Sequence, residues 1–146
     1  MVCTIYTPEE LCKKRSFSKD RVEVLARFRG GLILVPHENS WALPETSPVR
    51  GESMEETAQR ALGAAMGEAV FGVRLLSGFT VTGPDGREAG GYAFLADVET
   101  WPDEGEAGAE AFDPLPEEIA EKALVYGLRR WAWPFFLKTE GTQRLI

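Results

Sequence analysis

The segment from Ser53 to Gly67 constrains the fold most, because it carries the signals for both ends of one helix. Ser53 followed three residues later by Glu56 is typical of a capping box, in which each side chain accepts a hydrogen bond from the other residue's backbone N–H. The apolar residues that follow recur at helical spacing; they are Ala58, Ala61, Leu62, Ala65 and Met66. Gly67 then stops the helix. We therefore expect a helix over residues 53–66 with one face packed on a core.

Strand patterns precede and follow this helix. Residues 21–28 alternate in the manner of a strand, and residues 32–35 form a short apolar run directly after a glycine pair. Residues 73–82 and 88–98 are also strand-like, and the Pro-Asp-Gly turn sequence within 83–87 predicts that they form an antiparallel hairpin. Together these patterns predict an α/β (α+β) fold, in which a mixed β-sheet is flanked by helices.

Two further segments have the composition of loops. Residues 36–48 hold three prolines, although Trp41 and Leu43 should anchor this loop to the core. Residues 102–116 are acidic and rich in Gly, Ala and Pro, which predicts an exposed connection. The apolar spacing in residues 117–131 then predicts a C-terminal helix.

The length of the chain fits one domain over residues 1–146. Thr7 and Glu10 form a second capping box, which predicts a short N-terminal helix or turn. We expect residues 1–19 to be an N-terminal extension and the core to span roughly residues 20–131.

Charge and hydropathy restrict the partners and the location. The formal net charge of −7 argues against nonspecific binding of nucleic acid, which depends on Lys and Arg displacing phosphate counterions. The longest apolar runs, 31–36 and 131–137, are far shorter than the roughly 20 residues of a membrane span. No signal-peptide pattern opens the chain, so we expect a cytoplasmic protein that does not bind a membrane. Cys3 and Cys12 are expected to be free thiols.

The predicted helix also carries a spaced motif. Trp41-Ala42-Leu43-Pro44 leads into it, and Glu52, Arg60, Leu62 and Gly67 then follow at spacings that match, without a gap, the signature G-x5-E-x7-R-E-U-x-E-E-x-G-U, where U is a bulky aliphatic residue. In motif and order of elements, residues 20 to 131 resemble the Nudix (MutT-like) family. The resemblance implies a nucleotide-binding hydrolase fold.

The signature is degenerate at the positions that carry the chemistry. The resemblance implies three glutamates that hold magnesium, and this chain has Ala61, Ala64 and Ala65 there. Thr46 replaces the first glycine, and Glu68 replaces the last aliphatic residue. Hard cations need clustered oxygen ligands, which alanine does not offer. We therefore expect no catalytic residues and no cofactor. If the chain is active, we expect the metal to be Mg²⁺ and Glu52 to be its one ligand.

Several residues are candidates for a ligand site. Glu45, Glu52, Tyr92 and Phe94 are the predicted ligand-binding residues, and Tyr92 and Phe94 fall on one face of a strand. Core packing explains these two aromatic residues equally well. Glu52 and Arg60 are equally explained by ordinary helix electrostatics.

Three functions remain open at this point. The first is a non-catalytic Nudix-like domain that binds a nucleotide-like or phosphorylated small ligand, or a protein partner. The second is a divergent hydrolase of nucleoside diphosphate-linked substrates, helped by the acidic residues 103–110 and by a displaced carboxylate set drawn from Glu45, Glu52, Glu55, Glu56 and Glu68. The third is a structural or oligomerisation module, possible as a homodimer. Its interface would be the C-terminal aromatic segment Trp131, Trp133, Phe135 and Phe136, which could instead stack a base or pack in the core.

Overall fold

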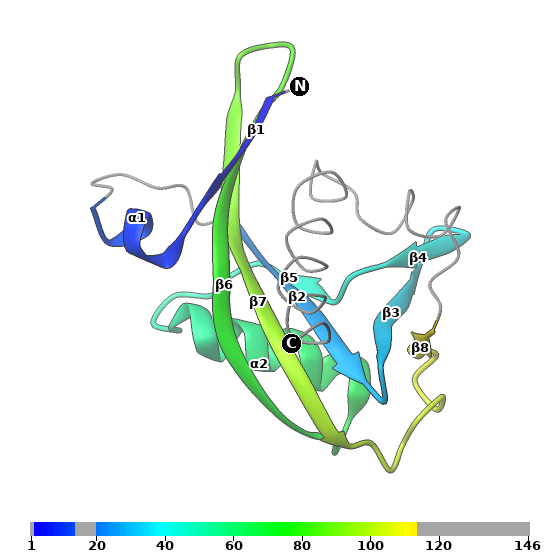
Figure 1. Ribbon diagram of the computed structural model, residues 1–146. Coiled ribbons are helices and arrows are strands. Elements are labelled where there is room, and N and C mark those ends of the chain that lie inside the picture. The colour runs from blue at the N-terminus through cyan, green and yellow to red at the C-terminus, as the bar shows by residue number, and fades with distance from the viewer. Residues whose placement is uncertain (1, 14–19, 114–146) are drawn as a thin grey trace.

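A mixed sheet forms the centre of the computed structural model, which describes residues 2–13 and 20–113 (Figure 1). Its strands are β1 (Val2–Tyr6), β2 (Arg21–Phe28), β3 (Gly31–His37), β4 (Ser40–Ala42), β5 (Glu45–Thr46), β6 (Val70–Thr82), β7 (Glu88–Thr100) and β8 (Glu110–Phe112). They run in the order β1-β6-β7-β2-β3-β4, with β5 beside β2 and β8 beside β3. Strands β2 and β7 are parallel and the other pairs are antiparallel. The predicted mixed α/β sheet is thus confirmed.

The long β6–β7 hairpin closes where the sequence predicts. Gly86 N donates to Gly83 O at 3.0 Å, and Gly83 N donates to Arg87 O at 2.9 Å. Gly86 has a φ of 82°, which glycine adopts without strain. Both strands reach further than the expected 73–82 and 88–98, because the far end of the hairpin is paired from Val70 to Thr100.

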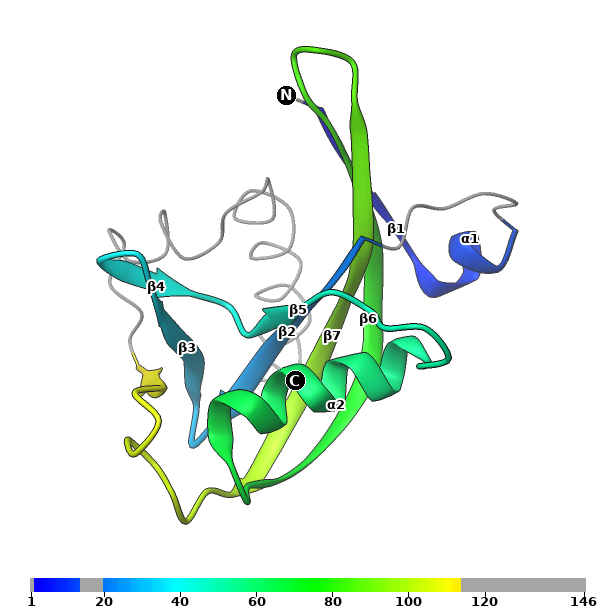
Figure 2. The ribbon, with the colours of Figure 1, turned by 180° about the vertical axis from the view of Figure 1, so that it is seen from behind.

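Helix α2 (Met54–Met66) crosses one face of the sheet (Figure 2). The predicted capping box is present: Glu56 N donates to Ser53 Oγ at 3.0 Å, and Ser53 N donates to Glu56 Oε1 at 3.1 Å. The helix ends at Gly67, as expected. Its buried face meets the sheet in a core that contains Ala58, Ala61, Leu62 and Met66 of the helix and Val22, Val24, Ala26, Ile33, Phe94 and Ala96 of the strands.

The opposite face of the central strands is buried as well. Side chains alternate along a strand, so the neighbours of Val22 and Val24 point away from α2. Leu25 on β2 and Ala93 and Leu95 on β7 are each 1% exposed. The neighbour between Val22 and Val24 is Glu23, which is 2% exposed. The centre of the sheet therefore holds a buried carboxyl group on the face away from α2.

The N-terminal residues are partly as predicted. Helix α1 (Pro8–Lys13) begins after Thr7, and Glu10 N donates to Thr7 Oγ1 at 3.2 Å. Strand β1 was not predicted from the sequence. It extends the sheet by pairing with the tip of β6, from Val2 opposite Thr82 to Tyr6 opposite Gly78. The partner lies more than 70 residues away, so no local pattern could have indicated this pairing.

Both predicted loops contain short strands, which corrects the expectation. Residues 36–48 include β4 and β5, and residues 102–116 include β8. These strands have two or three residues, too few to show a period of two. The predicted anchoring is confirmed. Leu43 is 2% exposed, and the rings of Trp41 and Phe112 pack edge to face with their centroids 4.9 Å apart.

Two predictions concern the C-terminal part of the chain. The predicted helix 117–131 and the aromatic residues Trp131, Trp133, Phe135 and Phe136 lie outside the described residues. Among the helices of the described part, none has the length and apolar character needed to cross a membrane.

Candidate functional site

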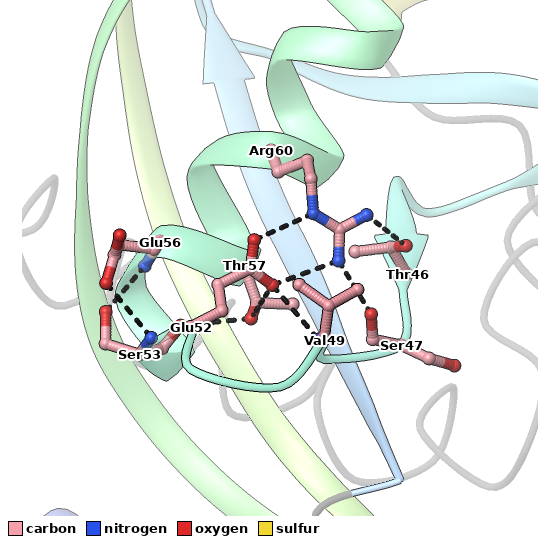
Figure 3. A network of polar contacts seen from close by, with 8 residues as sticks. All are labelled: Thr46, Ser47, Val49, Glu52, Ser53, Glu56, Thr57 and Arg60. Carbon is pink, nitrogen blue, oxygen red and sulfur yellow. Dashed lines mark hydrogen bonds and ion pairs between the residues drawn. The ribbon is translucent and has the colours of Figure 1, made fainter.

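Glu52 lies in the loop that leads into α2, and donors surround its carboxylate (Figure 3). Arg60 binds both oxygens, through Nε to Oε2 at 2.9 Å and through Nη2 to Oε1 at 3.0 Å. Thr57 Oγ1 donates to Oε1 at 2.6 Å, and the backbone N–H of Val49 donates to the same oxygen at 3.3 Å. The hydrogen bonds from Arg60 first, and then from Thr57, lower the pKa of Glu52 to about 2. Glu52 is therefore ionised and fully engaged by its neighbours.

Arg60 extends the same network to the preceding strand. Its Nη1 donates to Thr46 Oγ1 at 3.1 Å, and its Nη2 donates to the carbonyl oxygen of Ser47 at 2.7 Å. We call Thr46, Ser47, Glu52, Thr57 and Arg60 the arginine clamp. It ties β5 and the loop after it to the first turns of α2. The sequence analysis treated Thr46 only as a replaced glycine and did not consider Thr57. Thr46 and its partner Arg60 are 14 positions apart in the sequence.

The three alanines of α2 have different surroundings. Ala61 is 6% exposed and belongs to the core under the helix, and Ala65 packs against that core. Ala64 is exposed. Glu68, beyond the end of the helix, is also exposed, and its backbone N–H donates to Asp103 Oδ2 at 3.2 Å. Across residues 2–13 and 20–113, no group of three or more His, Cys, Asp or Glu side chains is placed to hold a metal ion.

Glu45 lies beside a carboxyl group that sequence reasoning missed. It pairs in register with Glu23 of the neighbouring strand β2. Arg21 Nη1 lies 3.4 Å from Glu45 Oε2 and 3.8 Å from Glu23 Oε1. Burial, and next the charge of Glu45, raise the pKa of Glu23 well above its usual value. The one sequence signal was an acidic residue between Val22 and Val24 of a strand.

Tyr92 and Phe94 occupy the face of the sheet that α2 covers. Phe94 is 4% exposed within the core, and Tyr92 packs against that core. They pair with Val22 and Val24, whereas Glu45 pairs with Glu23 and so faces the other way. The structure therefore separates Glu45 from the two aromatic residues and does not bring the predicted ligand-binding residues together.

Solved structures share this architecture. A variant of the Bacillus subtilis pyrophosphohydrolase BsRppH superposes with a TM-score of 0.76 at 23% identity, over 97% of this chain and 90% of that one. The Nudix hydrolase RenU of M. smegmatis superposes with a TM-score of 0.53 at 20% identity, over 94% of each chain. The chain has the Nudix fold.

The Nudix fold is recognisable here from structure and not from overall sequence similarity. A UDP-X diphosphatase also superposes, with a TM-score of 0.58 at 17% identity, over 92% of this chain and 71% of that one. No protein-family profile matches the sequence, and no curated protein matches it. At sequence identities of 17–23%, the similarity to these structures shows a shared fold.

Proposed function

We propose that this chain is a non-catalytic Nudix-fold domain that binds a nucleotide-like or other phosphorylated small ligand, or a protein partner. The observation that carries the proposal is the alanine face of α2. Ala61, Ala64 and Ala65 stand where the Nudix signature has metal-binding glutamates. Cleavage of a diphosphate by this family's chemistry needs a hard cation held by several oxygen ligands. Methyl groups supply none.

The arginine clamp supports the same conclusion for Glu52. A metal ion at this carboxylate would compete with Arg60, Thr57 and the N–H of Val49, all of which already donate to it. The guanidinium would also repel the cation. On this proposal Glu52 holds the loop on the helix, and Ala61, Ala64 and Ala65 offer no carboxylate to Mg²⁺.

The displaced carboxylate set is spread over the molecule. Glu45 faces away from α2, and Glu56 is occupied by the capping box. Glu52 and Glu68 lie at opposite ends of α2, which has 13 residues and so spans about 20 Å. Among the described residues, no three His, Cys, Asp or Glu side chains are placed to hold one metal ion, so the divergent hydrolase ranks second.

The names of solved structures with this fold support the proposed ligand class. One is named as a pyrophosphohydrolase and another as a UDP-X diphosphatase. A fold can keep a binding surface after its chemistry is lost, because binding needs fewer groups in place than catalysis does.

The first test is hydrolysis. We expect no release of phosphate or nucleotide above background from nucleoside triphosphates, ADP-ribose, dinucleoside polyphosphates or NADH with Mg²⁺ or Mn²⁺. Turnover that falls in a Glu52→Gln variant would establish the divergent hydrolase and overturn the proposal.

The second test restores carboxylates to the helix. An Ala64→Glu/Ala65→Glu variant should bind Mn²⁺ more tightly than a matched Ala64→Gln/Ala65→Gln variant, measured by titration of free Mn²⁺. Ala61 is left unchanged because it is packed in the core. Equal Mn²⁺ binding by the two variants would mean that this helix face is not a former metal face.

The third test is binding by the unmodified chain without metal. Calorimetric titration with ATP, ADP-ribose, a UDP-sugar and pyrophosphate should give saturable binding of at least one compound. Absence of binding to all of them would remove the small-ligand proposal.

A further inference from the structure

Strand β1 ends the sheet and leaves one backbone edge open. It is the first strand in the order β1-β6-β7-β2-β3-β4, and among residues 2–13 and 20–113 it pairs with β6 alone. Figure 1 shows β1 beside the tip of the β6–β7 hairpin, which projects beyond α2. The backbone N–H and C=O groups along the outer edge of such a strand can pair with a further strand.

The outer edge of β1 lacks the features that normally prevent pairing between chains. Native edge strands are protected by charged side chains, by proline, by bulges or by being very short. The five residues Val2–Tyr6 include no charged residue and no proline. They pair with β6 from Val2 opposite Thr82 to Tyr6 opposite Gly78 without a register shift, so β1 has no bulge. Strand β1 is therefore able to accept another strand along its full length.

The other end of the sheet is protected in the ways that β1 is not. Strand β4 has three residues, and its neighbour β3 contains Pro36, which has no backbone N–H. Strand β8 also has three residues, and one of them is Glu110. Of the outer strands that the structure describes, β1 is thus the one suited to pairing with another chain.

Charge and symmetry favour a second copy of this chain as the partner. The formal net charge is −7, so two copies repel each other over most of their surfaces. At β1 two copies can meet without bringing like charges together. A two-fold axis is the commonest symmetry of protein assemblies, and it makes two identical strands antiparallel. An axis at Thr4 matches every residue from Val2 to Tyr6 with a residue of the same strand in the other copy.

Thr4 is suited to the position on this axis. Its side chain is exposed, and within one copy it pairs in register with Thr80 of β6. Residues paired in register lie on the same face of a sheet, and threonine pairs across strands are favourable. Tyr6 belongs to the same face, because its hydroxyl lies 3.4 Å from Thr80 Oγ1. Pairing at the axis would therefore continue the Thr80–Thr4 row into the second copy.

We propose that the outer edge of β1 pairs with β1 of a second copy in an antiparallel, two-fold arrangement centred on Thr4, which joins the sheets of the two copies. This interface differs from the C-terminal aromatic segment that the sequence analysis considered. It goes beyond the proposed function and does not depend on it, because it involves no ligand. Five paired residues make a small interface, so the dimer should dissociate on dilution.

The first test is the mass of the full chain by sedimentation equilibrium at concentrations up to about 1 mM. We expect the mass to rise from one chain toward two as the concentration increases. Thr4→Lys should keep the chain monomeric, since like charges would then lie opposite each other on the axis. Gln59→Lys adds the same charge at an exposed position of α2 and should leave the dimer unchanged. A full chain that stays monomeric throughout overturns the proposal.

Charge rescue separates strand pairing from local damage to β1. A mixture of the Thr4→Lys and Thr4→Glu chains should form the dimer again, because opposite charges then meet at the axis, whereas each chain alone should stay monomeric. Mixing would not repair a β1 that no longer folds onto β6. A dimer that persists in each single variant, or a mixture that stays monomeric, contradicts pairing centred on Thr4.

An intermolecular disulfide tests the register. In a Cys3→Ser/Cys12→Ser background, Thr4→Cys should cross-link two chains on mild oxidation. Residues opposite each other in an antiparallel pair have Cα atoms about 4.5–5.5 Å apart, which is within the range of a disulfide. In the same background Glu9→Cys, at an exposed position of α1, should not cross-link. Equal cross-linking of the two variants, or none with Thr4→Cys, overturns the proposed pairing.

Discussion

Two side chains of α2, Arg60 and Thr57, and the backbone N–H of Val49 in the preceding loop donate to the Glu52 carboxylate and keep it ionised. Its pKa is lowered to about 2, against 4.5 for an unperturbed glutamate. A group whose pKa is lower in the folded state stabilises the fold above its unfolded pKa, and this contribution is lost as pH falls toward the folded value. The stabilisation from Glu52 is therefore present at neutral pH and fades between about pH 5 and pH 2.

The Glu52→Gln variant should unfold at lower urea concentration than the unmodified chain at pH 7, and the difference should shrink as pH falls toward 3. Glutamine keeps the size of the side chain but loses the ion pair with Arg60. Urea midpoints at several pH values measure this. Glu55→Gln, at an exposed position in the same helix, is the control. A constant difference between pH 7 and pH 3 would mean that the charge of Glu52 does not matter.

Glu23 should behave in the opposite sense. Its raised pKa means that the folded state keeps a proton that the unfolded state releases above its own pKa of about 4.5. Stability from this group is therefore present at low pH and is lost as pH rises through the folded pKa. Glu23→Gln should be more stable than the unmodified chain at pH 8, with a smaller gain at pH 5, as thermal midpoints would show. A Glu99→Gln variant on an exposed position should show neither effect.

Gly63 within α2 and Gly67 at its C-terminal cap differ in the substitutions that they tolerate. Gly67 has a φ of 68°, and an added Cβ would lie 2.8 Å from Asp103 Oδ2. Gly63 is within the helix, and an added Cβ would meet nothing within 4 Å. The helix therefore requires glycine at its end but not in its third turn.

Gly67→Ala should destabilise the fold by about 1–3 kcal/mol, because alanine is strained in this backbone conformation. Gly63→Ala should stabilise it by about 0.5–1 kcal/mol, because alanine is the better helix former. Denaturant unfolding of both variants measures the two effects, and each is the control for the other. Equal effects of the same sign would contradict the helix end described here.

The N-terminal strand β1 completes the sheet at its β6 edge. Strand β1 covers the outer edge of β6, and an uncovered edge strand can pair with other chains. Removal of residues 1–13 should lower the thermal midpoint and produce concentration-dependent association in light scattering, while leaving α2 helical by circular dichroism. A monomer with an unchanged midpoint would contradict this. A homodimer of the full chain stays a prediction, and the same light-scattering measurement tests it.

Patterns along the chain were sufficient to predict the parts of this protein whose signals join neighbouring residues. The capping boxes at Thr7 and Ser53, the turn at Gly83–Gly86 and the apolar face of α2 each join residues within a few positions of one another, so they can be recognised along the chain. The matches of Glu52 and Arg60 to the Nudix signature could be recognised for the same reason, although the ion pair between them could not.

Contacts between residues far apart in the chain could not be predicted in this way. Strand β1 pairs with residues more than 70 positions away, and Glu23, Ala93 and Ser77 come side by side from three different strands. Thr46 meets Arg60 only because β5 lies beside the start of α2. The burial of Glu23 likewise depends on both faces of β2 being covered, which alternation along one strand does not specify. Local sequence patterns determine where helices and strands form. Packing between distant helices and strands determines which polar groups are paired, buried or left without a partner.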